Sequence, residues 1–263
     1  MTPASAACYP GIMKPLSKDE IPKMRAAGKL AARTLEHAAK YVKAGISTNE
    51  IDKIVHDFTL SHGAVPAPLG YHGFPKSVCT SVNACICHGV PDSTILKKGD
   101  LINVDVTCIL DGFFGDTSKT IFVGEVSDKA KDLTDCAEKA MWKGIEEVKP
   151  FATTGDIGFA INKLVTKRGY FVVREIGGHG IGKIFHDDPF VPSHGKKGRG
   201  PKLQPWCCIT VEPMVNQTDV ELEEFDIPKS TIKYYLTGDR TLSAQFEHTV
   251  LVTDRGFEIM TLP

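Results

Sequence analysis

Apolar residues recur at helical spacing over residues 24–42, and this stripe stops at Gly45. Ser17 and Glu20 precede it with the spacing of a capping box, in which each residue satisfies a backbone N–H of the other. Pro22 favours a delayed start, since proline is tolerated only in the first helical turn. We therefore predict an amphipathic helix whose apolar face covers a core.

A second capping box, Ser47 with Glu50, opens a predicted helix that runs to about Gly63. Two further helices are predicted from Ser127 to about Val148 and from Thr154 to about Arg168. The strands between them have apolar patterns, so we expect the helices to pack outside a mostly antiparallel sheet.

The chain repeats itself. A shift of 106 residues aligns Ser47-Thr48 with Thr153-Thr154, and a shift of 107 aligns Val104-Asp105 with Val211-Glu212. Two matches in the same order at nearly the same offset indicate two related halves, about 18–125 and 126–263. The alternative is a chance recurrence of capping and strand patterns.

Residues 101–122 form a predicted hairpin around Asp111-Gly112, a pair suited to a type I′ turn. Pairing Leu110 with Phe113 places Thr107 opposite Asp116. Asp105 then lies on the same face, diagonally from Asp116, so the two carboxylates converge.

Two like charges at this diagonal spacing, roughly 7–8 Å between backbones, repel unless one is protonated or a cation lies between them. Glu212 and Glu247 also stand in apolar strands, where an unpaired carboxylate is costly. Each could be a satisfied structural residue or, for Asp105 and Asp116, a surface residue. Together they favour a metal site.

His179 lies among small residues in the run GGHGIG, where backbone can approach a crowded site and an imidazole is available as a ligand. The run lacks the spacing of a nucleotide-binding loop. Four carboxylates and one imidazole suit two divalent ions of Mn, Fe, Co or Zn. This donor set predicts a dinuclear hydrolase.

The composition limits which partners, cellular location and cysteine chemistry we expect. The formal net charge of -1 over 263 residues gives no overall attraction to nucleic acid or membranes. The first residues lack a secretory signal and no stretch approaches a membrane span, so a cytoplasmic protein is expected. The eight cysteines include no CxxC pair and are predicted to be reduced, mostly buried thiols. The basic stretch 196–202 could touch ribosomal RNA, but we favour a solvated loop.

Several motifs in a fixed order resemble the type I methionine aminopeptidases: NVDVT, DGFFGDTS, GHGIG, FHDDP, VEPMV and SAQFEHT. The similarity runs from about Lys18 to Thr253. It implies an α+β, pita-bread fold of two pseudo-symmetric halves, with a central antiparallel sheet covered by helices. A single catalytic domain, 18–263, would follow a short N-terminal extension, 1–17.

The resemblance also implies roles. Asp105 would chelate one metal, His179 and Glu212 the other, and Asp116 and Glu247 would bridge the pair. His88 would contact the substrate backbone near the scissile amide, and His186 would stabilise the carbonyl oxygen, unless both only pack behind the site. Glu212 is also the candidate for relaying a proton to the leaving amine.

The family's methionine pocket corresponds to Tyr71, His72, Phe74 and Cys79, and Phe246 is a further candidate. The chain departs from the family pattern at the long acidic segment 216–236 and at single positions. Lys233 stands where many relatives have tryptophan, Phe74 replaces a tyrosine, and Trp206-Cys207 replaces Gly-Met. These changes make the shape of the pocket the least determined part of the prediction.

The implied activity is co-translational removal of the initiator methionine before a small second residue, by attack of a two-metal-activated water on the first peptide bond. N-termini of nascent proteins would be the partners, with transient ribosome contact open and a monomer the simplest state. The rivals are an X-Pro dipeptidase or aminopeptidase P, and an inactive pita-bread module that binds proteins or ribosomes without metal.

Overall fold

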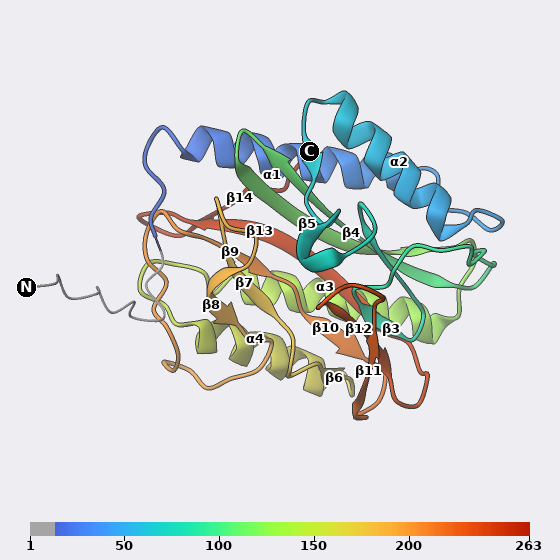
Figure 1. Cartoon of the computed structure of the whole chain (residues 1–263). Coiled ribbons are helices and arrows are strands. Elements are labelled where there is room, and N and C mark those ends of the chain that lie inside the picture. Colours follow the sequence, from blue (N-terminus) through green and yellow to red (C-terminus); the bar gives the residue numbers. More distant parts are fainter. Residues whose placement is uncertain (1–13) are drawn as a thin grey trace, which may run out of the picture.

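The computed structural model describes residues 14–263, in which four helices cover an antiparallel sheet (Figure 1). The expected extension 1–17 therefore lies mostly outside the described residues, as does the segment judged to lack a signal. The helices are α1 Ile21–Ala39, α2 Thr48–Ser61, α3 Asp128–Ile145 and α4 Thr154–Lys167, with a short 3-10 turn, η1, at Tyr71–Gly73. The strands are β1 Val65–Pro66, β2 Cys79–Val82, β3 Cys85–Cys87, β4 Leu101–Leu110, β5 Phe113–Phe122, β6 Phe171–Val172, β7 Gly178–Ile181, β8 Asp187–Val191, β9 Cys208–Val211, β10 Met214–Asn216, β11 Leu222–Asp226, β12 Lys233–Thr237, β13 Ser243–Val252 and β14 Phe257–Ile259.

Helix α1 is shorter than predicted. Its N-cap is Glu20, which makes no side-chain cap, and the Ser17 N–H donates to the Glu20 carboxylate at 2.8 Å as only half of a capping box. It ends at Ala39, well before Gly45, because the chain then turns and the Gly45 N–H donates to the Leu96 carbonyl at 2.8 Å. The apolar stripe is thus helical only in its first part.

Helices α2 and α4 begin with the same complete capping box, Ser47 with Glu50 and Thr153 with Asp156. Each capping residue also forms an isolated antiparallel bridge, Ser47 to Ile95 and Thr153 to Lys202. The repeat seen in the sequence is therefore present in the fold, and the predicted starts of both helices are confirmed.

The larger sheet follows the order β1-β4-β5-β13-β9-β7-β8, and every pairing in it is antiparallel. In the β4–β5 hairpin Leu110 pairs with Phe113 and Thr107 with Asp116, as predicted. Asp111 and Gly112 have φ values of 51° and 78°, which are the positive values that a type I′ turn requires.

Side chains alternate between the two faces of the sheet. Val104 and Val106 join the buried core beneath α1 and α2, so Asp105 between them points to the opposite face. On β13, Phe246 packs against the core that includes α3 and α4, whereas Glu247 faces away from it. The helices therefore cover one face, and the acidic residues gather on the other.

The departing segment 216–236 contains a hairpin, β11 with β12, that joins β3 in a separate three-stranded sheet. Among the described cysteines none is bonded to another, and all but Cys85 are buried, which confirms that the thiols of that part of the chain are mostly buried. No helix among residues 14–263 is long and apolar enough to cross a membrane.

Candidate metal centre and substrate cavity

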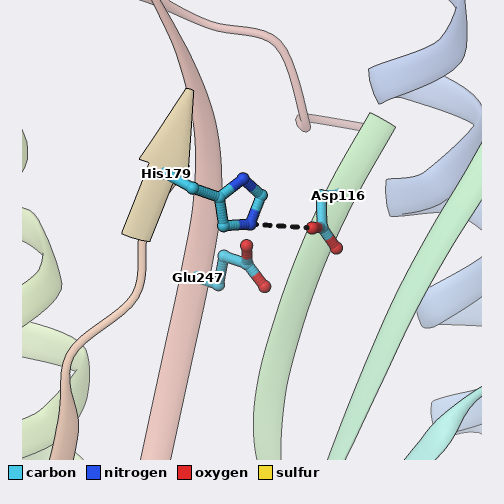
Figure 2. Close-up of side chains that lie close together, drawn as sticks. All are labelled: Asp116, His179 and Glu247. Atoms are coloured by element: carbon cyan, nitrogen blue, oxygen red, sulfur yellow. Dashed lines mark ion pairs between the residues drawn. The ribbon is translucent and has the colours of Figure 1, made fainter. Parts of the chain in front are cut away.

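All five predicted ligands line one cavity of about 150 Å³ on the helix-free face of the sheet. They come from separate elements: Asp105 from β4, Asp116 from β5, His179 from β7, Glu247 from β13, and Glu212 from the residue directly after β9. Residues from both halves of the repeat therefore meet here. Figure 2 shows three of them, Asp116, His179 and Glu247, projecting toward a common point.

The donor atoms are close enough to share a cation. One oxygen or nitrogen from each of Asp116, His179 and Glu247 lies within 4.8 Å of the others. His179 Nε2 is 3.7 Å from Asp116 Oδ2 (Figure 2) and 3.5 Å from Glu212 Oε1. The structure contains no ion, and these spacings come from the side chains alone.

The buried carboxylates repel one another, and a cation between them would remove this repulsion. Asp116 and Glu247 are 4% and 2% exposed, and Glu247 Oε1 has no hydrogen-bond partner among the described residues. Burial first, and then repulsion by neighbouring carboxylates, raises the pKa of both far above the ordinary range. Burial likewise raises the pKa of Asp105 and Glu212. Divalent ions would relieve this cost, so the residues fit a metal centre.

The ring of His179 is oriented for ligation. Its Nδ1 lies 3.0 Å from the Gly180 carbonyl oxygen, which can only accept, so Nδ1 carries the proton. Burial lowers the pKa of His179, and the neutral ring turns the lone pair of Nε2 toward Asp116 and Glu212. This is the tautomer that a metal-binding imidazole needs.

Three residues that the sequence did not single out hold the carboxylates. The Thr107 hydroxyl donates to Asp116 Oδ1 at 2.7 Å, and the Thr210 hydroxyl donates to Glu212 Oε1 at 2.8 Å. The Gln245 amide reaches the other oxygen of Glu212, Oε2, at 3.2 Å. Each stands two residues from a predicted ligand on the same strand face, and that spacing was a signal that could have found them.

The predicted methionine pocket is only partly assembled as expected. Tyr71, Phe74 and Cys79 line the cavity. His72 does not; it is exposed, and its ring packs edge-on against Tyr71 at 4.4 Å between centroids. Phe246 is also absent from this wall, because the alternation along β13 turns it to the helix side, where it lines a second cavity.

Four further apolar side chains line the cavity without having been predicted. Phe185 adjoins His186 in the sequence, and this adjacency was the only hint of it. Ile232 lies beside Lys233 in the departing segment 216–236, and Ile176 directly precedes the GGHGIG run, but nothing in the sequence pointed to these two side chains or to Pro68.

The two predicted substrate histidines, His88 and His186, both line the cavity. His88 Nδ1 lies 2.9 Å from the Lys233 carbonyl oxygen, and His186 Nδ1 lies 2.9 Å from the Tyr71 hydroxyl. The His186 ring is 4.3 Å from that of His179, between centroids. Both imidazoles therefore stand beside the carboxylate cluster.

The structure shows what two unusual parts of the sequence, Lys233 and the basic stretch 196–202, contact. Lys233 directs its ammonium to Glu224, at 2.6 Å, and it is its neighbour Ile232 that lines the cavity. The basic stretch 196–202 is an exposed loop whose backbone is tied to α4, where Gly198 N–H donates to Asp156 at 2.9 Å. The predicted solvated loop is thus also a partner of the α4 capping box.

Known proteins resemble the chain over almost its whole length. Residues 22–254 match the model of metallopeptidase family M24. A methionine aminopeptidase of Rickettsia prowazekii is 50% identical over 91% of this chain and 92% of its own, and methionine aminopeptidase A of Synechocystis is 50% identical over 94% and 96%. The crystal structure of a methionine aminopeptidase from Rickettsia prowazekii superposes with a TM-score of 0.92 at 47% identity, covering 95% of this chain and all of that one.

Proposed function

The chain belongs to metallopeptidase family M24 and, within it, to the methionine aminopeptidases, and on this premise we propose that it removes the initiator methionine from proteins with a small second residue. The observation that carries the proposal is the gathering of Asp105, Asp116, His179, Glu212 and Glu247 around one cavity. The antiparallel sheet covered by helices, together with the superposition on a solved methionine aminopeptidase, confirms the predicted pita-bread fold. The division into halves at residue 125 and the extension 1–17 stay predictions.

In this proposal the five residues would hold divalent metal, and the family resemblance implies two ions. Asp105 would hold one, His179 and Glu212 would hold the other, and Asp116 and Glu247 would serve both. The burial of Asp116 and the unpartnered oxygen of Glu247 support bridging positions for these two residues. Co, Mn, Fe and Zn all suit such a donor set. Bound ions of this kind supply an activated water at neutral pH and polarise a carbonyl.

The protein's own groups bind and orient the peptide. Tyr71, Phe74 and Cys79 form an apolar wall for the methionine side chain. His88 contacts the substrate backbone, and His186 stabilises the carbonyl oxygen as charge develops on it. Glu212, held by Thr210 and Gln245, relays a proton to the leaving amine.

The proposal includes the setting in which the protein acts. N-termini of nascent chains are the substrates, the protein acts as a monomer in the cytoplasm, and any contact with the ribosome is transient.

A direct test incubates the purified protein with the peptide MetAlaSer and Mn or Co. We expect free methionine, no release after chelation, and no release by Asp116→Asn. Asp111→Asn is the matched control, because it changes an aspartate on the same hairpin at the exposed turn. Failure to release methionine, or release that survives chelation, would overturn the proposal. Faster cleavage of Xaa-Pro peptides would favour the X-Pro rival.

A further inference from the structure

The two histidines of the cavity differ in what holds them. His88 directly follows β3 and His186 directly precedes β8, and each has one bonded ring nitrogen, Nδ1, at 2.9 Å from its partner. The partner of His88 is a backbone carbonyl, and that of His186 is a phenol. A neutral imidazole has one N–H and one lone pair, so the partner of Nδ1 decides what Nε2 can do.

The Lys233 carbonyl can only accept a hydrogen bond. The proton of His88 therefore lies on Nδ1, and Nε2 presents a lone pair. Burial lowers the pKa of His88, which keeps the ring neutral near pH 7. His88 is thus an acceptor for an N–H group.

The Tyr71 hydroxyl can donate or accept, and its only hydrogen-bond partner among the described residues is His186. A phenol is a much stronger acid than a neutral imidazole N–H, and an imidazole nitrogen is a much stronger base than a phenol oxygen. The better bond is therefore O–H to Nδ1. His186 then carries its proton on Nε2.

We infer that Tyr71 is a positioning residue that fixes His186 as the Nε2–H tautomer, so that His88 and His186 offer a peptide opposite groups, an acceptor and a donor. A peptide backbone presents an N–H and a C=O, and this pair of imidazoles matches both. The inference rests on the proposed function for the identity of the peptide, but the tautomers themselves do not depend on it.

Packing holds the rings in place independently of the hydroxyl. His186 stacks on Phe185 with centroids 4.1 Å apart, and Tyr71 packs against the same phenylalanine at 4.9 Å. The phenyl ring of a Tyr71→Phe variant keeps these contacts. What it loses is the one donor to Nδ1, after which either nitrogen of His186 is free to carry the proton.

The test reads the protonated nitrogen directly, by long-range ¹H–¹⁵N spectra of zinc-loaded protein with ¹⁵N-labelled histidine near neutral pH. His186→Gln and His88→Gln assign the signals. We expect His88 protonated on Nδ1 and His186 on Nε2, with the Nε2–H form of His186 lost or mixed in Tyr71→Phe. Tyr170→Phe is the matched control, since its hydroxyl bonds Asp132 at 2.7 Å, outside the cavity.

Kinetics give the second readout. Because one donor to the carbonyl oxygen is misplaced in part of the molecules, Tyr71→Phe should lower kcat about tenfold and leave KM unchanged, whereas Tyr170→Phe changes neither. His186 protonated on Nδ1 in the wild type, or an identical tautomer in Tyr71→Phe, overturns the inference. Wild-type protein with the expected tautomers that releases no methionine would instead refute the proposed function.

Discussion

The Thr210 hydroxyl donates to Glu212 Oε1 at 2.8 Å and at the same time accepts the backbone N–H of His179 at 3.0 Å. Its single proton is committed to the carboxylate, which leaves its lone pair for the neighbouring strand. One fully buried side chain thus sets the separation of two ligands contributed by β9 and β7.

Removing this hydroxyl should weaken metal binding. Thr210→Val keeps the shape of the side chain but frees Glu212 to rotate, so we expect a 10–100-fold loss of affinity for Mn or Co, roughly the effect of losing a partner of a ligand. Calorimetric titration of the metal-free protein measures it. Thr210→Ser retains the hydroxyl and should bind nearly as the wild type; equal affinities for all three proteins would contradict the role.

Removing the metal should make stability depend on pH. In the metal-free protein, burial raises the pKa of Asp105 to about 7 and that of Glu212 to about 8, above the unfolded values near ~4. The folded state then binds more protons than the unfolded state, so the free energy of unfolding falls as pH rises toward 8.

At lower pH the buried histidines change the free energy of unfolding in the opposite direction, so that it rises with pH. The pKa of His179 is lowered to about 4, so His179 contributes stability that is gained as pH rises to about 6.5 and is constant above it. Between about pH 6.5 and 7.5 the carboxylates dominate the trend, because the buried thiols, whose pKa is raised by burial, add to it only as pH approaches the unfolded thiol pKa of about 8.5. Thermal unfolding across that window should show a falling Tm with a chelator and a flat Tm with saturating Mn. A flat curve in both conditions would contradict the burial argument.

Glu247→Gln should raise the stability of the metal-free protein and at the same time abolish metal binding. Because burial raises the pKa of Glu247 well above its ordinary value, the metal-free fold must take up a proton there that the unfolded chain releases, whereas a neutral glutamine has no such cost; at pH 8 the metal-free variant should be more stable than the wild type by about 1–3 kcal/mol, the equivalent of one to two pKa units. It should lose metal and activity. Urea unfolding with metal analysis checks both; Glu125→Gln, at an exposed position, should change neither.

The gathering of these acidic side chains was predictable because a carboxylate in an apolar strand is unusual, and because the Asp111-Gly112 turn fixes the register that brings Asp105 beside Asp116. Helix starts were predictable for the same local reason, where a capping box is complete. The end of α1 was not, since Gly45 is held by a distant carbonyl, that of Leu96.

The walls of the cavity were predicted less well than the five candidate ligands that gather in it. The wrong placement of Phe246 came from nearness in sequence to Glu247, although neighbouring residues on a strand face opposite ways. Ile232 and Pro68 line the cavity through long-range packing that no local pattern encodes. The acidic segment 216–236 was flagged as a departure, but its pairing with β3 depends on the folded chain.

The lysine that replaces the family's tryptophan should matter little for methionine binding. The Lys233 ammonium pairs with Glu224, and the part of this residue that serves the site is its carbonyl, which bonds His88. Lys233→Ala keeps that carbonyl, so KM for a methionine peptide should stay unchanged. Phe74→Ala removes a fully buried ring from the wall and should raise KM by about 10-fold or more, from about 1.4 kcal/mol or more of lost apolar contact. Steady-state kinetics on MetAlaSer compares them, and a raised KM in Lys233→Ala would show that the lysine stem reaches the substrate.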